Sequence, residues 1–175
     1  MINFPTLKNN LYDFVYGQGG QAAVWADQNA PQLTKPYISM RIASVDSIGW
    51  DYNSTPNKTT LKSTLTGNRE FILYLQAYGT NAMGVLENVR TALQKTDVLD
   101  TLRAGGIVFV DDFPIQNLSD VQDTQFLERA AMDILFRIAS IVTPDNKVIE
   151  KMEDVNAKYY KDQTKVLEEE FSINT

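Results

Sequence analysis

The stretch REFILYLQAY at residues 69–78 decides the fold class, because it predicts a strand that is apolar on both faces. One face would carry Phe71, Leu73 and Leu75, and the other Ile72, Tyr74 and Tyr78. A strand with two apolar faces is typically covered on both sides. We therefore expect residues 69–78 to form a central strand of a sheet.

The other expected strands follow from the same kind of pattern. They are residues 38–43, 61–65, 107–110 and 132–138. The alternation after residue 38 slips near Val45, which predicts a bulge or a strand end there. Gly67-Asn68 is expected to be the turn before the central strand, and residues 107–110 are apolar enough to be buried.

Apolar spacings of three and four predict helices between these strands. The predicted helices are residues 7–15, with Thr6 as N-cap and Gly17 as the stop, residues 82–93, capped by Thr80, and residues 97–103. Residues 18–35 contain glycines and prolines that disfavour long regular structure, yet they include Trp25. We expect another part of the structure to bury the Trp25 indole.

Short turns between consecutive strands predict a mostly antiparallel sheet with helices packed on one face, an α+β arrangement. No internal repeat or linker divides the 175 residues, so we expect one domain over residues 1–175. For residues 147–175, hairpin and helix both stay open as predictions, and an extended arm or hairpin is favoured.

The composition excludes most familiar catalytic centres. The chain has no His and no Cys, which removes Ser-His-Asp and Cys-His catalysis, cysteine-based zinc sites and disulfides. Sixteen Lys and Arg against 22 Asp and Glu give a net charge of −6, which disfavours tight binding to nucleic acid. The residues from Met1 to Pro5 lack the pattern of a signal peptide, and no apolar run is long enough for a membrane span. We expect synthesis in the cytoplasm and no membrane contact.

An acidic group follows the strand at residues 107–110. It comprises Asp111, Asp112, Asp120, Asp123 and Glu128. Carboxylates of this kind could bind Mg²⁺, but their spacing misses that of a calcium-binding loop, and solvated acidic loops are common. We expect no metal, no cofactor and no catalytic residue. Gly17 to Gln21 likewise lacks the Lys-Ser/Thr of a phosphate-binding loop.

Aromatic residues near loops are candidates for an interface, with core packing as the alternative. Trp25 and Trp50 favour the interface, because both flank expected loops.

Two motifs resemble the neck and tail terminator family of tailed bacteriophages. The first is WADQNAP at residues 25–31, followed by Pro36-Tyr37 and a strand. The second is Phe109-Val110-Asp111-Asp112, followed by Glu128-Arg129-Ala130 at the start of the strand at 132–138. Both occur in the order that the family shows.

The resemblance implies a structural virion protein and not an enzyme. It would be a tail completion protein that forms a homohexameric ring, ends the tail tube and takes part in head-tail joining at the neck. Its partners would be further copies of itself, the tail tube protein and a neck, connector or head-completion protein, with the tail sheath as a further candidate. DNA would pass through the lumen without specific binding. The loop residues expected to shape an interface are Trp25, Gln28, Asn29, Pro31, Pro36, Tyr37 and Trp50.

Two other functions stay open at this point. One is a metal-dependent hydrolase built on the acidic group, and the other is a monomeric adaptor that binds one partner without forming a ring.

Overall fold

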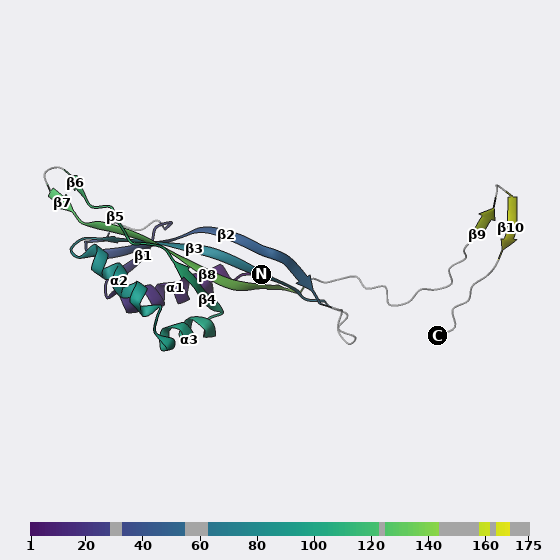
Figure 1. The fold of residues 1–175 in the computed structure, drawn as a ribbon, viewed down its shortest axis with the longest axis horizontal. Coiled ribbons are helices and arrows are strands. Elements are labelled where there is room, and N and C mark those ends of the chain that lie inside the picture. The colour runs from purple at the N-terminus through teal and green to yellow at the C-terminus, as the bar shows by residue number, and fades with distance from the viewer. Residues whose placement is uncertain (29–32, 55–62, 123–124, 144–157, 162–163, 169–175) are drawn as a thin grey trace.

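The computed structural model describes residues 1–28, 33–54, 63–122, 125–143, 158–161 and 164–168. Its largest element is a six-stranded sheet with the order β1-β2-β3-β8-β4, in which β5 also pairs with β8 (Figure 1). The bounds are β1 Ala22–Trp25, β2 Tyr37–Asn53, β3 Leu65–Tyr78, β4 Ile107–Asp112, β5 Gln116–Asn117 and β8 Arg129–Val142.

The stretch at residues 69–78 is central, as predicted. It belongs to β3, which pairs antiparallel with β2 on one side and with β8 on the other. Phe71 and Leu73 lie on the face covered by helices, beside Phe136 and Ile134 of β8, and all four are buried. The second face of β3 is half-buried and has no helix over it in the described chain.

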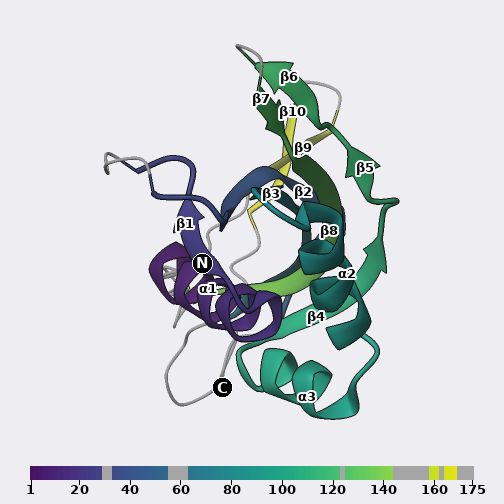
Figure 2. The ribbon, with the colours of Figure 1, turned by 90° about the vertical axis from the view of Figure 1, so that its left-hand side faces the viewer.

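Three helices of the described chain cover the first face of the sheet (Figures 1 and 2). They are α1 Phe4–Gly19, α2 Ala82–Ala92 and α3 Thr96–Ala104. Each has its buried residues on one side, including Leu11 in α1, Leu86 in α2 and Leu102 in α3. The α+β class with helices packed on one face is thus confirmed.

The helix boundaries differ from the predictions because caps depend on local geometry. Asn3, and not Thr6, caps α1: its side-chain oxygen accepts a hydrogen bond from the backbone N–H of Thr6 at 3.2 Å. The helix continues past Gly17 to Gly19 and ends at Gly20, whose positive φ of 63° suits glycine. In α2 the residue before the helix is Asn81, so Thr80 is not the cap.

Three strand predictions need correction. Gly67-Asn68 lies within β3, whose register with β8 is unbroken there, so it is not a turn. Residues 61 and 62 lie outside the described residues, and Leu65 starts β3 itself. In β4, Ile107 is buried but Val108 and Val110 are 44% and 39% exposed, because β4 is an edge strand.

Trp25 also differs from its prediction as a loop residue. It ends β1, which pairs parallel with β2, an exception to the otherwise antiparallel sheet. The bulge expected near Val45 is confirmed as a register shift between Ile42 and Ser44.

Two small hairpins complete the described chain. β6 Asp120–Gln122 pairs with β7 Gln125–Leu127, and β9 Lys158–Lys161 pairs with β10 Thr164–Glu168. The second hairpin lies within residues 147–175, most of which lie outside the described residues, so the extended arm or hairpin expected for that segment stays a prediction. The first lies at one end of β8, whereas the far ends of β2, β3 and β8 project past the helices at the other (Figure 1).

Candidate functional site

The projecting end of β2 presents the most exposed large apolar side chain among those described. Trp50 is 99% exposed, and Tyr52, two residues further along the strand, is 69% exposed. Ile141 on β8, near the same end, is 55% exposed. We call the segment formed by residues 45–53, 65–70 and 138–142 the arm. A concentration of exposed apolar side chains of this kind marks a contact surface.

A bulge in β2 presents Trp50 to solvent. Ile48 pairs with Asn68, and Tyr52 pairs with Thr66, so β2 has two more residues than β3 across this interval. Gly49 supplies the positive φ of 66° that the irregularity requires. Such bulges redirect a side chain while leaving the flanking pairing intact.

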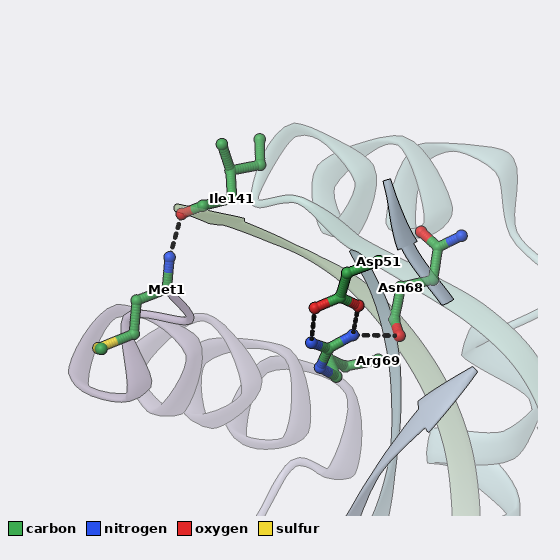
Figure 3. A network of polar contacts seen from close by, with 5 residues as sticks. All are labelled: Met1, Asp51, Asn68, Arg69 and Ile141. Carbon is green, nitrogen blue, oxygen red and sulfur yellow. Dashed lines mark hydrogen bonds and ion pairs between the residues drawn. The ribbon is translucent and has the colours of Figure 1, made fainter. Parts of the chain in front are cut away.

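An ion pair directly after Trp50 fastens the bulge to β3. Both Arg69 terminal nitrogens donate to Asp51, at 2.7 Å and 2.6 Å, and Figure 3 shows this two-bond geometry together with a bond to the Asn68 carbonyl. The hydrogen bond from Arg69 lowers the pKa of Asp51. The two side chains are only 19% and 27% exposed, so the pair is better shielded than a typical surface ion pair.

Gly67 makes room for this pair. A Cβ at that position would lie 1.9 Å from Asp51 Oδ1 and 2.5 Å from Arg69 Nη1. The arm is also tied to the N-terminus, because the Met1 amino group donates to the Ile141 carbonyl (Figure 3). The tip is therefore held by polar contacts while Trp50 stays uncovered.

The opposite end of the sheet presents a second apolar group, on the β6–β7 hairpin. Val121 and Phe126 are cross-strand partners and are 65% and 66% exposed. The hairpin is anchored at its base by Glu128, whose carbonyl accepts from the Gly79 N–H at 3.0 Å and whose carboxylate accepts from the Asn81 N–H. Both ends of the molecule thus offer apolar surface on an anchored support.

The structure places the predicted loop residues in different surroundings. Trp25 is half-buried against the core, with Lys8 Nζ 5.1 Å from its ring centroid. Tyr37 is buried and stacks on Tyr78, with ring centroids 4.9 Å apart. Gln28 and Pro36 are exposed. Asn29 and Pro31 lie outside the described residues.

The acidic group is dispersed. Asp112 forms an ion pair with Arg90 of α2 at 2.6 Å, and Asp111 and Asp120 each accept from the next backbone N–H. Glu128 is engaged at the hairpin base, and Asp123 lies outside the described residues. Within the described chain, no three acidic side chains converge on a point where a metal ion could bind.

A polar network lies on the face of the sheet that has no helices. Arg129 donates to the Gln76 side chain at 2.9 Å and lies over the Tyr78 ring, and the Tyr78 hydroxyl donates to Gln76 at 2.5 Å. Burial raises the pKa of Tyr78, and it also raises the pKa of Asp133 nearby on β8. This network orders the face, and it contains no arranged nucleophile and base.

Sequence reasoning missed Val121 and Phe126, as well as the Asp51–Arg69 pair that supports Trp50. The one available signal was Gly49 beside Trp50, since a glycine inside a strand pattern indicates a bulge. The exposure of these side chains depends on where the helices end, which periodicity does not reveal.

Comparison with known proteins identifies a family that this sequence matches. The sequence matches the family described as phage neck terminator protein over residues 6–164. No curated protein matches the chain. None of the helices in the described residues has the length and apolar character needed to cross a membrane.

Proposed function

The chain belongs to the phage neck terminator family, and from this premise we propose that it forms a homohexameric ring that ends the tail tube. In this role it is a structural protein of the virion neck, made in the host cytoplasm. The match over residues 6–164 carries the proposal, because it covers the sheet, the helices and both exposed ends.

The two edges of the sheet support a ring. β1 pairs with residues 37–40 of β2, so from Arg41 onward β2 has no strand on that side within the described chain. At the other edge, β4 likewise has no described strand beyond it. Pairing the β2 edge of one copy with the β4 edge of the next is a head-to-tail contact, and repetition of such a contact closes a ring when the rotation allows.

The two exposed ends supply contacts beyond the ring. The arm and the β6–β7 hairpin lie at opposite ends of β8 (Figure 1). We propose that the hairpin end and the surface of the arm outside Trp50 bind the tail tube protein and the neck, connector or head-completion protein, one partner at each end, with the sheath as a further candidate. Gln28 and Pro36, which are exposed between β1 and β2, would add to these contacts.

The acidic charge suits a passage for DNA. A net charge of −6 makes the ring repel phosphates within roughly one Debye length, about 8 Å at physiological salt. DNA would therefore pass through the lumen without being held.

Electron microscopy of assembled particles tests the proposal. We expect an antibody or fusion tag on this chain to label a ring at the junction of neck and tail, and we expect particles lacking the chain to have unjoined tails of irregular length. A label elsewhere on the virion, or normal joined tails without the chain, would contradict it. A single copy per particle would instead favour the monomeric adaptor.

A further inference from the structure

We propose that Trp50 of one copy inserts into the cavity between α1 and α3 of the neighbouring copy. The inference rests on the proposed ring and specifies the contact that joins its subunits. The knob is Trp50 on the arm. The socket is the cavity, with a volume of about 340 Å³, and its principal lining residues are Asn10, Asp13, Phe14, Val98, Thr101 and Leu102.

Several features of the arm together hold Trp50 in its exposed position. Exposing an entire indole forgoes the stabilisation that burial of a large apolar side chain provides. The bulge, the positive φ of Gly49 and the Asp51–Arg69 pair nevertheless hold the residue 99% exposed. An occupant that covers the ring accounts for these features together.

The cavity fits an indole in size and chemistry. Pockets that take small organic groups have volumes of about 300 to 1,000 Å³, so one indole fits. The floor is apolar, because Phe14, Val98 and Leu102 are all buried residues of the core. Asn10, Asp13 and Thr101 bring oxygen acceptors to the wall, and an indole has one N–H to donate.

The position of the cavity matches the proposed ring contact. Trp50 belongs to β2, whose outer edge is open. α3 packs against β4, the opposite edge strand. α1, which forms the other wall of the cavity, packs against β1, so only the α3 side of the cavity lies toward the β4 edge. When the β2 edge of one copy meets the β4 edge of the next, the arm would approach the cavity from this α3 side.

A second cavity is less suitable as the socket. It is lined by Met83, Gly84, Glu87, Arg90, Pro114 and Ile115. None of these residues is fully buried, and only Ile115 packs against the core, so the cavity is shallower toward the core than the one between α1 and α3. It also contains Arg90, which is engaged with Asp112.

Crosslinking tests whether the arm of one copy lies at the cavity of another. The chain has no native cysteine, so introduced cysteines are the only reactive thiols. Two single variants, Tyr52→Cys and Thr101→Cys, leave Trp50 in place and would be mixed and treated with a short bis-maleimide. We expect a crosslinked dimer that requires both variants. The matched control mixes Tyr52→Cys with Met83→Cys at the second cavity, and we expect no dimer there. Efficient crosslinking to position 83, or none to position 101, would overturn the inference.

Fluorescence supplies an independent readout, because the chain has two tryptophans. In a Trp25→Phe variant, emission comes from Trp50 alone, and we expect it to shift to shorter wavelength as the concentration and the oligomer mass rise together. An oligomer whose Trp50 emission stays solvent-like overturns the inference, as does a chain that stays monomeric at the highest concentration reached.

Variants of Trp50 and Val121 distinguish an error in the proposed subunit contact from an error in the proposed role at the neck. We expect Trp50→Ala to abolish ring formation while Val121→Ala leaves it intact, with circular dichroism showing both variants folded. If Trp50→Ala particles carry a normal labelled ring, the knob-in-socket contact is wrong and the terminator role stands. If wild-type particles carry no label at the neck, the proposed function itself is wrong.

Discussion

Single residues at the arm show how a strand can be shaped for contact. Gly49 allows a left-handed turn, Gly67 leaves space on the neighbouring strand, and Asp51 and Arg69 occupy that space. None of the four adds apolar burial. Their combined effect is geometric, since they determine where Trp50 points and how firmly it is held.

Asp133 gives a prediction at this scale. Its carboxyl is partly buried on the helix-free face of β8, and burial raises its pKa above the usual 3.8. The ionised form is thus disfavoured in the folded state, so we expect Asp133→Asn to increase the free energy of unfolding at neutral pH. Chemical denaturation across a pH series measures this difference.

The pH dependence of that difference has a defined sign. As the pH falls through the raised pKa, the folded protein takes up the proton before the unfolded chain does, so the wild type recovers stability. The advantage of the Asn variant should therefore shrink and vanish below pH 3.8. Asp27→Asn, at an exposed position, is the control. A constant advantage at every pH would refute the burial argument.

Among the elements, α1 connects the N-terminus, the core and the proposed socket. Its buried side, which includes Leu7, Leu11 and Val15, packs into the core, while Asn10 and Asp13 line the cavity. Its first turn depends on Asn3, followed by Pro5, a residue that suits the start of a helix. Loosening that turn would thus affect both stability and the cavity wall.

Replacing the cap tests this role of α1. We expect Asn3→Ala to lower the free energy of unfolding by about 1 kcal/mol, because the Thr6 N–H loses its acceptor. Asn9→Ala, at an exposed position on the same helix, should be neutral or slightly stabilising, since alanine favours helix. Denaturant titration compares the two. Equal losses would show that the cap contributes nothing specific.

For the whole molecule, charge determines how the chain meets DNA. On the helix-free face, Arg137 forms an ion pair with Glu70, and Arg129 donates a hydrogen bond to the Gln76 side chain. Because these arginines are already paired, less positive charge is available to bind phosphates. The net charge of −6 also disfavours DNA binding.

Binding of duplex DNA is therefore predicted to be absent at physiological salt. Fluorescence anisotropy with a labelled duplex should show no saturable change for the wild-type chain. A triple variant with Asp111, Asp120 and Glu128 each changed to Lys reverses local charge, raising the net charge from −6 to 0, and should bind weakly in a salt-dependent way. Saturable, salt-dependent binding by the wild type would contradict a passive lumen.

Local patterns were sufficient for the elements that bury a continuous apolar side. The central strand at 69–78, the helix at 82–93 and the strand at 132–138 were all predicted within a few residues, because their periodicity follows directly from burial on one face. Prediction failed at Gly67 and Thr6. At Gly67 the outcome depended on Asp51 of the neighbouring strand, whereas at Thr6 the cap that the structure uses, Asn3, lies only three residues earlier in the chain.

The sequence alone thus determined the α+β class, the apolar side of the long helices and strands, and the absence of histidine and cysteine chemistry, since each follows from composition or from short-range spacing. Only the tertiary structure decided that Trp50 is uncovered, that β1 runs parallel to β2, and that a cavity lies between α1 and α3. Exposure, strand partners and cavities are produced by contacts between residues far apart in the chain, and no local pattern encodes them.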